Sequence, residues 1–382
     1  MVTPQMEAEQ AVLGAVLLDP RQLAAVSSWL RPAHFYRPAH TALYEVLLAQ
    51  KKDGHPGLSG DSEARSAWAL EAMTTASAAC PAFTAGYGHT LIAACPTAGH
   101  AASYGRMVLE TAIRRQVHEH AHRLLAAART GHTDTVPQLT GDLRTAITHL
   151  ADTWGALDQR PVPLTGPWPL ELPENTTEET LSREEVLLAS LSAAPTDLLD
   201  IARWLHPVDF LDSGHQALYQ ALLALGHRGE AIDSLTVLWE AQHRGALASG
   251  AITADRIRRI TRVGYSGDPG YWAEQVLCAS LLRSATAAAG AVRLLSRDAA
   301  LSAARLLGSA LHVLREAEAV QSRWRTATGG ARGRPARGDP EPFRRDAART
   351  RTLAPVPDTA GATPPSPAQQ AAPPRTPVRS TH

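Results

Sequence analysis

Apolar residues recur along most of the chain at spacings of three and four positions, the period of an amphipathic helix. Residues 7–18 follow this pattern, and Asp19-Pro20 is suited to start a second helix that ends near Trp29. A third helix is predicted over residues 38–52, because Pro38 can open a helix and Gly54 follows its end. The pattern therefore predicts an all-α protein.

The sequence contains an internal repeat with an offset of 175 residues. When residues 12–50 are placed over residues 187–225 without gaps, 14 of the 39 positions are identical. Matches of aromatic residues are harder to attribute to helical composition than matches of Ala and Leu. We therefore expect two tandem helical domains that arose by duplication. The repeated aromatic residues are their predicted core anchors: Trp29, Phe35, Tyr44, Trp204, Phe210 and Tyr219.

Each copy is predicted to consist of a small helical head followed by a long helical hairpin. The hairpin helices are expected over residues 101–129 and 135–154 in the first copy, and over residues 271–296 and 298–325 in the second. An isolated hairpin cannot cover its apolar face, so it should pack on its own domain or pair with another hairpin, within one chain or between chains. The predicted hairpin interface consists of Val108, Ile113, Val117, Leu124, Val276, Leu281, Val292 and Leu295.

Composition sets the expected boundaries. The first domain covers residues 1–156, a proline-rich linker residues 157–181, the second domain residues 182–325, and a tail residues 326–382. The tail contains 11 of the 27 prolines, with few residues that could form a core. Such a segment buries too little apolar area to offset the entropy of ordering, so we expect a disordered C-terminal tail.

Charge is unevenly distributed, although the chain has 37 basic and 37 acidic residues. Residues 321–382 carry 11 arginines against four acidic residues, which favours contact of the tail with a polyanion. The alternative is a tail that only aids solubility, since few aromatic residues are available for base stacking. The candidate nucleic-acid contacts are Arg332, Arg334, Arg337, Arg344 and Arg345.

Several classes of protein are disfavoured. The three cysteines form no CxxC pair, which argues against a disulfide framework or a thiolate zinc site. We find neither the pattern of a signal peptide nor an apolar run long enough for a membrane span, so a cytoplasmic location is expected. Lys51 and Lys52 are the only lysines, and neither precedes Ser or Thr, so no P-loop motif is present. No catalytic residue and no cofactor are predicted.

Two sets of histidines were considered as sites. Residues 118–122 fit the HExxH pattern, which makes His118 and His122 weak candidate metal ligands. The alternatives are a solvated helix face, which we favour, and adventitious metal capture, since no convincing third ligand follows. His40 and His215 recur beside an aromatic residue in the two copies, which favours a structural role over catalysis.

The residues Pro4 to Asp19, PQMEAEQAVLGAVLLD, closely resemble the opening of the DnaB replicative helicase family. Further similarity to the N-terminal domain of that family lies in Phe35-Tyr36 with His40 and in residues 95–98 and 104–108. The second copy is similar in residues 231–233, 235–237 and 272–276. The resemblance covers about residues 3–155 and 183–320, so the chain is similar to two tandem copies of this domain.

The resemblance implies a helical head and a hairpin that pairs with other hairpins in a collar, on which primase and helicase loaders dock. Where the family continues into a RecA-like ATPase domain, this sequence has a second helical domain. We therefore expect a non-catalytic replication protein that binds primase, replicative helicase or a loader protein, as an intramolecular pseudo-dimer or a homo-oligomer. The alternatives are a nucleic-acid-binding protein acting through its tail and a decayed relative of the helicase.

Overall fold

The computed structural model describes residues 3–59, 61–155, 158, 174–262 and 267–331. These residues form fourteen α-helices and five short 3-10 helices, and they contain no β-strand. The predicted all-α class, with a head and a long hairpin in each copy, is confirmed. Of the expected tail, residues 326–331 belong to the last helix, and residues 332–382 lie outside the described residues.

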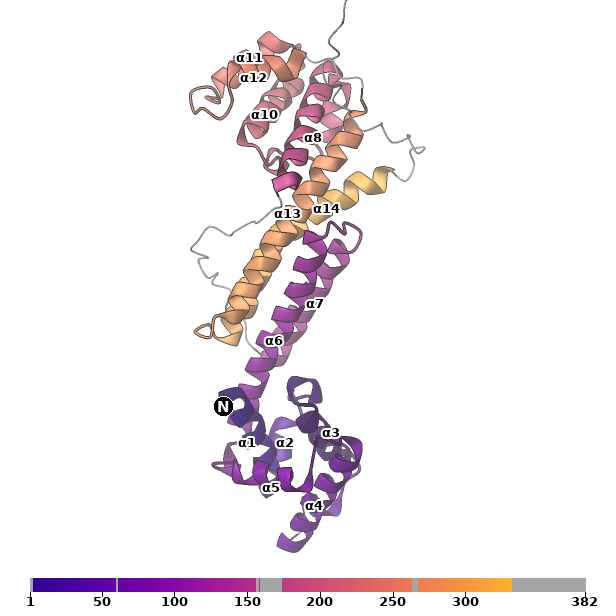
Figure 1. Cartoon of the computed structure of the whole chain (residues 1–382), viewed down its shortest axis with the longest axis vertical. Coiled ribbons are helices and arrows are strands. Elements are labelled where there is room, and N and C mark those ends of the chain that lie inside the picture. Colours follow the sequence, from indigo (N-terminus) through magenta and orange to yellow (C-terminus); the bar gives the residue numbers. More distant parts are fainter. Residues whose placement is uncertain (1–2, 60, 156–157, 159–173, 263–266, 332–382) are drawn as a thin grey trace, which may run out of the picture. The chain divides into compact units, whose positions relative to one another are not determined.

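The helices of the two copies follow one another in the same order (Figure 1). The first copy contains α1 (Pro4–Leu18), α2 (Gln22–Val26), η1 (Pro32–His34), α3 (Pro38–Lys52), η2 (Pro56–Leu58), α4 (Ser62–Ala79), α5 (Ala85–Ala93), η3 (Ala98–His100), α6 (Ala101–Arg129) and α7 (Val136–Trp154). The second contains α8 (Glu174–Ala193), η4 (Pro195–Asp197), α9 (Leu198–Ile201), η5 (Pro207–Asp209), α10 (Ser213–Arg228), α11 (Ser234–His243), α12 (Ala254–Arg262), α13 (Pro269–Arg297) and α14 (Ala303–Ala331).

Local sequence explains most of the helix ends. The Thr3 side chain accepts the N–H of Met6 at the start of α1, and Gly131 takes φ 75° after the end of α6. The second predicted helix was wrong in its start and length. Asp19 follows the last residue of α1, and the residue before α2 is Arg21, whose side chain makes no capping hydrogen bond.

The expected linker, residues 157–181, lies mostly outside the described residues, but α8 already begins at Glu174. Each head packs on its own hairpin, because α1 contacts α6 and α8 contacts α13. In each head one further helix packs on this first helix, α5 on α1 and α12 on α8. The pairs α3 with α4 and α10 with α11 also correspond. The duplication inferred from sequence is therefore visible in the packing of the helices.

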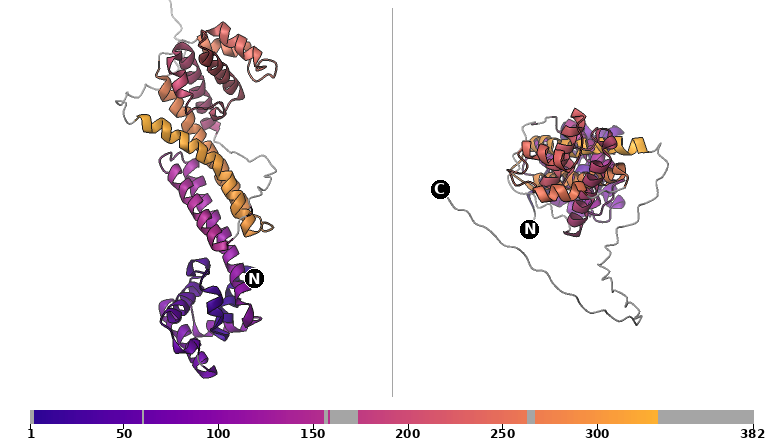
Figure 2. Two further views of the ribbon diagram at one scale, coloured as in Figure 1. Left: turned by 180° about the vertical axis from the view of Figure 1, so that it is seen from behind. Right: turned by 90° about the horizontal axis from the view of Figure 1, so that it is seen from above.

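The two hairpins pack against each other. Helix α6 lies along α13 and α7 lies along α14, in addition to the contacts within each hairpin. Figure 2 shows α14 beside α7 in the view from behind. These four helices, α6, α7, α13 and α14, are called the hairpin bundle below.

Helix α13 is long and apolar enough to cross a membrane, and it is the one such helix in the described part of the chain. More than half of its apolar stretch is buried inside the protein. Its burial follows from contacts with α6, α8 and α14, so its apolar composition matches that of a core helix.

Candidate functional site: the hairpin bundle and its two arginine pockets

The eight residues expected at the hairpin interface are all buried, with at most 3% of any one exposed. They lie on α6 and α13, whose first residues, Ala101 and Pro269, are 168 positions apart in helices of equal length, 29 residues. At this offset Val108 corresponds to Val276 and Ile113 to Leu281. Because α6 and α13 also pack on their own heads, the place of each residue between the hairpins stays a prediction.

Polar contacts also connect the two hairpins. Arg114 of α6 donates to the carbonyl oxygens of Asp298, at 2.6 Å, and of Leu301, both in the turn between α13 and α14. Arg144 of α7 pairs with Glu318 of α14 at 2.5 Å. These contacts fix the position of one hairpin along the other. Apolar packing alone specifies this position less strongly.

A buried pair of carboxylate and imidazole recurs in the two heads. Nδ1 of His40 lies 2.7 Å from Glu9, and Nδ1 of His215 lies 2.7 Å from Glu184. The same carboxylates accept backbone N–H groups, Tyr36 at 2.7 Å for Glu9 and Leu211 at 2.5 Å for Glu184. Each pair therefore anchors the segment between the 3-10 helix and the following helix to the first helix of its head.

The outer nitrogens of these two histidines have different partners. Nε2 of His40 lies 2.8 Å from the hydroxyl of Tyr87, whereas Nε2 of His215 lies 2.8 Å from a guanidinium nitrogen of Arg256. Because a guanidinium can only donate, Nε2 of His215 accepts and its Nδ1 carries the hydrogen donated to Glu184. All the polar atoms of both rings are occupied, so neither histidine is free to act on a substrate.

An arginine at matching positions of α6 and α13 supports each head. Nη2 of Arg115 donates to the carbonyl of His34 at 3.1 Å, and Nη2 of Arg283 donates to the carbonyl of Asp209. In both arginines Nη1 is buried and has no hydrogen-bond partner among the described residues. Each arginine lines a cavity, of about 860 Å³ beside Arg115 and about 710 Å³ beside Arg283.

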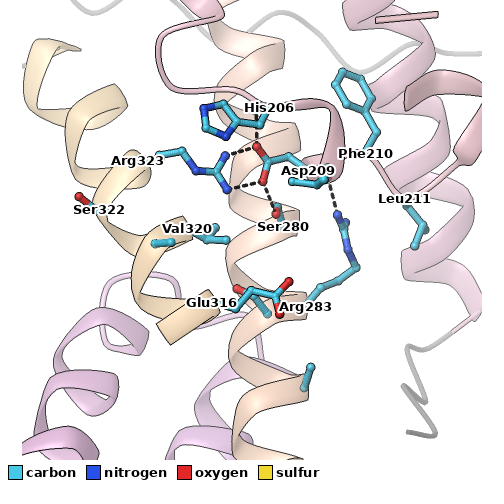
Figure 3. A pocket seen from close by; sticks show the side chains of 14 residues that line it. His206, Asp209, Phe210, Leu211, Ser280, Arg283, Glu316, Val320, Ser322 and Arg323 are labelled. Atoms are coloured by element: carbon cyan, nitrogen blue, oxygen red, sulfur yellow. Dashed lines mark hydrogen bonds and ion pairs between the residues drawn. The ribbon is translucent and has the colours of Figure 1, made fainter. Parts of the chain in front are cut away.

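The pocket beside Arg283 is balanced in charge (Figure 3). The carboxylate of Asp209 is fully buried and binds the guanidinium of Arg323, the hydroxyl of Ser280 at 2.7 Å and the N–H of His206 at 2.7 Å. Glu316 lines the same pocket. Both arginines of this pocket thus have an acidic residue in their surroundings.

In the first copy, His34 takes the place of Asp209. Its Nδ1 accepts the N–H of Arg31 at 3.0 Å, as Asp209 accepts the N–H of His206. Burial, together with the charges of Arg115 and Arg31, lowers the pKa of His34 to about 4. The imidazole is therefore neutral over the physiological range of pH.

The predicted core anchors differ in burial. Phe35, Tyr44, Phe210 and Tyr219 are buried, whereas Trp29 and Trp204 are half-buried. The Trp29 ring packs against Gly105 of α6, where an added Cβ would lie 2.8 Å from the ring. The guanidinium of Arg106 lies over the Trp29 ring, with 5.3 Å between Cζ and the ring centroid. Trp29 thus connects the head to the hairpin.

The candidate metal ligands lie on the surface of α6. Nδ1 of His118 lies 3.0 Å from the hydroxyl of Ser296, and His122 is exposed. Within the described ranges, no group of three or more His, Cys, Asp or Glu side chains could hold a metal ion. The candidate nucleic-acid contacts Arg332, Arg334, Arg337, Arg344 and Arg345 lie outside the described residues.

Sequence reasoning missed Glu9, Glu184, Arg115 and Arg283. The two glutamates obey the offset of 175 residues, and extending the comparison by three positions towards the N-terminus would have found them. The two arginines could be matched only at the offset of 168 residues that the hairpins follow.

Comparison with known proteins gives similarity to replicative DNA helicases. Residues 2–57 and 176–262 match the DnaB-like helicase N terminal domain. The replicative DNA helicase DnaB of Geobacillus stearothermophilus is 35% identical over 119 residues, which cover 30% of this chain and 24% of that helicase. The replicative DNA helicase DnaB of Leifsonia xyli subsp. xyli is 26% identical over 226 residues, which cover 59% of this chain and 45% of that helicase. The matched regions span less than half the length of either helicase.

Among solved structures, the N-terminal domain of DnaB helicase from Mycobacterium tuberculosis is 32% identical to the matched part of the chain. The match covers 37% of this chain and 96% of that domain, with a TM-score of 0.30.

Proposed function

We propose that this chain, which belongs to the family of the DnaB-like helicase N terminal domain and carries it in two tandem copies, is a non-catalytic protein-interaction module of DNA replication. Its partner is a primase, a replicative helicase or a helicase loader, and it acts in the cytoplasm. The absence of a P-loop lysine from these 382 residues supports a role without ATP hydrolysis.

The observation that carries this proposal is the packing of α6 and α7 against α13 and α14 within one chain. In the helicases, the resemblance implies that hairpins pair between subunits to form the collar. Here the second copy supplies the hairpin that another subunit would otherwise supply. The chain is accordingly a pseudo-dimer that presents two heads without requiring a ring of subunits.

An exposed apolar pair on the second head supports binding of a protein partner. Leu235 and Trp239 lie one turn apart on α11, and 71% and 62% of their surfaces are exposed. Trp239 is held by an edge contact with His243, at 5.6 Å between ring centroids. Large apolar side chains that protrude next to each other are typical of interface hot spots, in which Trp is enriched. We assign the docking surface to this face of α11.

The test is binding of the full chain to purified primase, replicative helicase and loader from the same organism. We expect one of the three to bind, and Trp239→Ala to weaken that complex by about tenfold or more. Leu70→Ala on α4 is the matched control, because this leucine is also exposed, at 60%, on the corresponding helix of the first copy. Failure of all three proteins to bind would contradict the proposal. Equal weakening by both substitutions would remove α11 as the docking surface.

A second candidate function is nucleic-acid binding by the tail, which the excess of arginine over acidic residues in residues 321–382 favours. Binding through phosphate contacts releases counterions and weakens steeply with salt. Gel shifts of the full chain and of a chain without residues 332–382, over a salt series, test this candidate. Tail-driven binding disappears with the deletion, and retention of binding after the deletion would exclude it.

A further inference from the structure

The pocket beside Arg115 contains more positive charge than the described residues around it neutralise. Four arginines line it, two from α6 and two from the last turns of α13, together with His118, His122 and a single acidic residue, Glu119. Both copies therefore contribute to the pocket, and it exists only when the two hairpins are packed together.

Three of these four arginines have no carboxylate within ion-pair distance among the described residues: Arg115, Arg293 and Arg297. Arg114 differs, because Glu110 binds it at 3.1 Å and carbonyl oxygens of the α13–α14 turn accept from it. The Nη1 atom of Arg115 and the Nε atom of Arg293 are buried without a hydrogen-bond partner there. Nη2 of Arg115 has carbonyl acceptors, but these two nitrogen atoms are withdrawn from water without an acceptor, which is costly and indicates a missing anionic partner.

His118 reports the positive potential of the pocket. The hydroxyl of Ser296 donates to the carbonyl of Arg293 at 2.7 Å, so it accepts from Nδ1 of His118. Nε2 of this ring has no partner among the described residues. Burial lowers the pKa of His118, and the charges of Arg297 and Arg293 lower it further. An anion in the pocket would reverse this electrostatic contribution.

The pocket beside Arg283, the arginine that matches Arg115, lies between α13 and α14 and shows that this excess is not a general feature of the fold. There Asp209 and Glu316 accompany Arg283 and Arg323 (Figure 3). The matched arginine of the second copy thus lies in a pocket of balanced charge, whereas the pocket beside Arg115, between α6 and α13, has an excess of positive charge. The difference points to a ligand that only the first pocket takes.

We propose that the pocket formed by Arg115, His118, Arg293 and Arg297 binds a di- or triphosphate group of the kind that a nucleotide carries. Arginine suits phosphate because its planar fork donates two parallel hydrogen bonds to one phosphoryl group. The pocket is open to solvent and its volume of about 860 Å³ can hold such a group, and a multiply charged anion matches three guanidinium groups that have no carboxylate partner among the described residues. Because both hairpins supply donors, binding stabilises the paired state of the hairpin bundle. This site is independent of the partner surface on α11.

The experiment is calorimetric titration of the full chain with inorganic triphosphate and with ATP, at constant ionic strength, with sulfate as the reference anion. We expect saturable binding of both phosphates at concentrations at which sulfate does not bind. The double substitution Arg293→Gln with Arg297→Gln weakens the binding of triphosphate and of ATP by about tenfold or more. Arg123→Gln with Arg305→Gln is the matched control, since these two arginines are exposed, do not line the pocket and remove the same charge. The control changes affinity less than twofold, as expected from the screening of distant surface charges.

Melting curves without ligand establish that each variant is folded. If the double variant does not fold, Arg297→Gln alone serves, because this exposed side chain makes no hydrogen bond that the fold would lose. Absence of saturable triphosphate binding would overturn the proposal, and so would equal losses in the pocket and control variants. Binding of an oligonucleotide with no terminal triphosphate, without binding of inorganic triphosphate or ATP, would also overturn it.

Discussion

Gln321 of α14 donates a hydrogen bond of 2.8 Å from Nε2 to the carbonyl oxygen of Pro137 in α7, which joins the hairpins of the two copies. Gln321 is 5% exposed, so its amide depends on this partner in place of water. The contact is polar, directional and partly buried, and it helps to specify how α7 and α14 are aligned within one chain.

Replacing Gln321 with Ala should lower the free energy of unfolding by about 1–2 kcal/mol, because the partly buried Pro137 carbonyl loses a donor and the buried side chain leaves a void. Gln138→Ala is the control, since Gln138 is exposed on the same helix as Pro137. Urea unfolding measures the free energy of unfolding of both variants. Equal stability of the two variants would show that the contact across the hairpins does not form.

Leu281 tests the apolar side of the hairpin bundle. It is 1% exposed on α13, so Leu281→Ala should cost about 2–5 kcal/mol through lost burial and a residual cavity. Leu294 lies on the same helix but is 51% exposed, and Leu294→Ala should change stability by less than about 0.5 kcal/mol. Thermal and chemical denaturation of the two variants measure the difference. A similar cost at both positions would contradict the assigned faces of α13.

His34 predicts a loss of stability in weak acid. Its pKa is lowered from 6.5 to about 4 in the folded chain, first by burial and then by Arg115. The unfolded chain therefore binds a proton at a higher pH than the folded chain does. The contribution of neutral His34 to the free energy of unfolding is complete above pH 6.5. It is lost as the pH falls from 6.5 towards 4. We expect the free energy of unfolding to decrease by about 3 kcal/mol over this range because of this residue.

Urea unfolding of the original chain and of His34→Asn, between pH 7 and pH 4.5, measures this decrease. The free energy of unfolding of the variant should depend less steeply on pH. The same substitution at the exposed His89 should leave the dependence unchanged. Identical slopes for the original chain and for His34→Asn would refute the role given to His34.

The buried carboxylates of the two heads provide a matched pair of variants. Glu9→Gln and Glu184→Gln each remove a charged acceptor from a histidine and from a backbone N–H, so each should cost about 1.5–3 kcal/mol. Glu45→Gln, at an exposed position, is the control. Similar costs in the two copies are the expected result from unfolding curves. A large cost in one copy and none in the other would show that the repeated geometry does not have the same energetic role.

The sequence predicted the elements with strong local signals. Helices α3 and α6 begin and end at the predicted residues, because Pro38 opens one and Gly131 follows the other. The helix after Asp19 was mispredicted because the Asp-Pro pair suits a helix start and a turn equally well. The local pattern could not decide between them.

The site was less accessible to sequence reasoning. An apolar stripe such as that of Val117 and Leu124 has the same composition whether it meets its own head, the other hairpin or another chain. The excess charge near Arg115 depends on Arg293 and Arg297, which the fold brings from the other copy. The exposure of Trp239 likewise follows from tertiary packing, since helical periodicity alone would place a tryptophan in the core.

The pairing of the hairpins within one chain is tested most directly by cross-linking Arg144→Cys with Glu318→Cys, two positions whose native side chains meet at 2.5 Å. The native cysteines, Cys80, Cys95 and Cys278, are first replaced by Ser, and each single variant is the control. A short bis-maleimide reagent added to dilute protein should give an internal cross-link at the mass of one chain, with a yield that does not change on dilution. A product at the mass of two chains, whose yield falls on dilution, would contradict pairing within the chain.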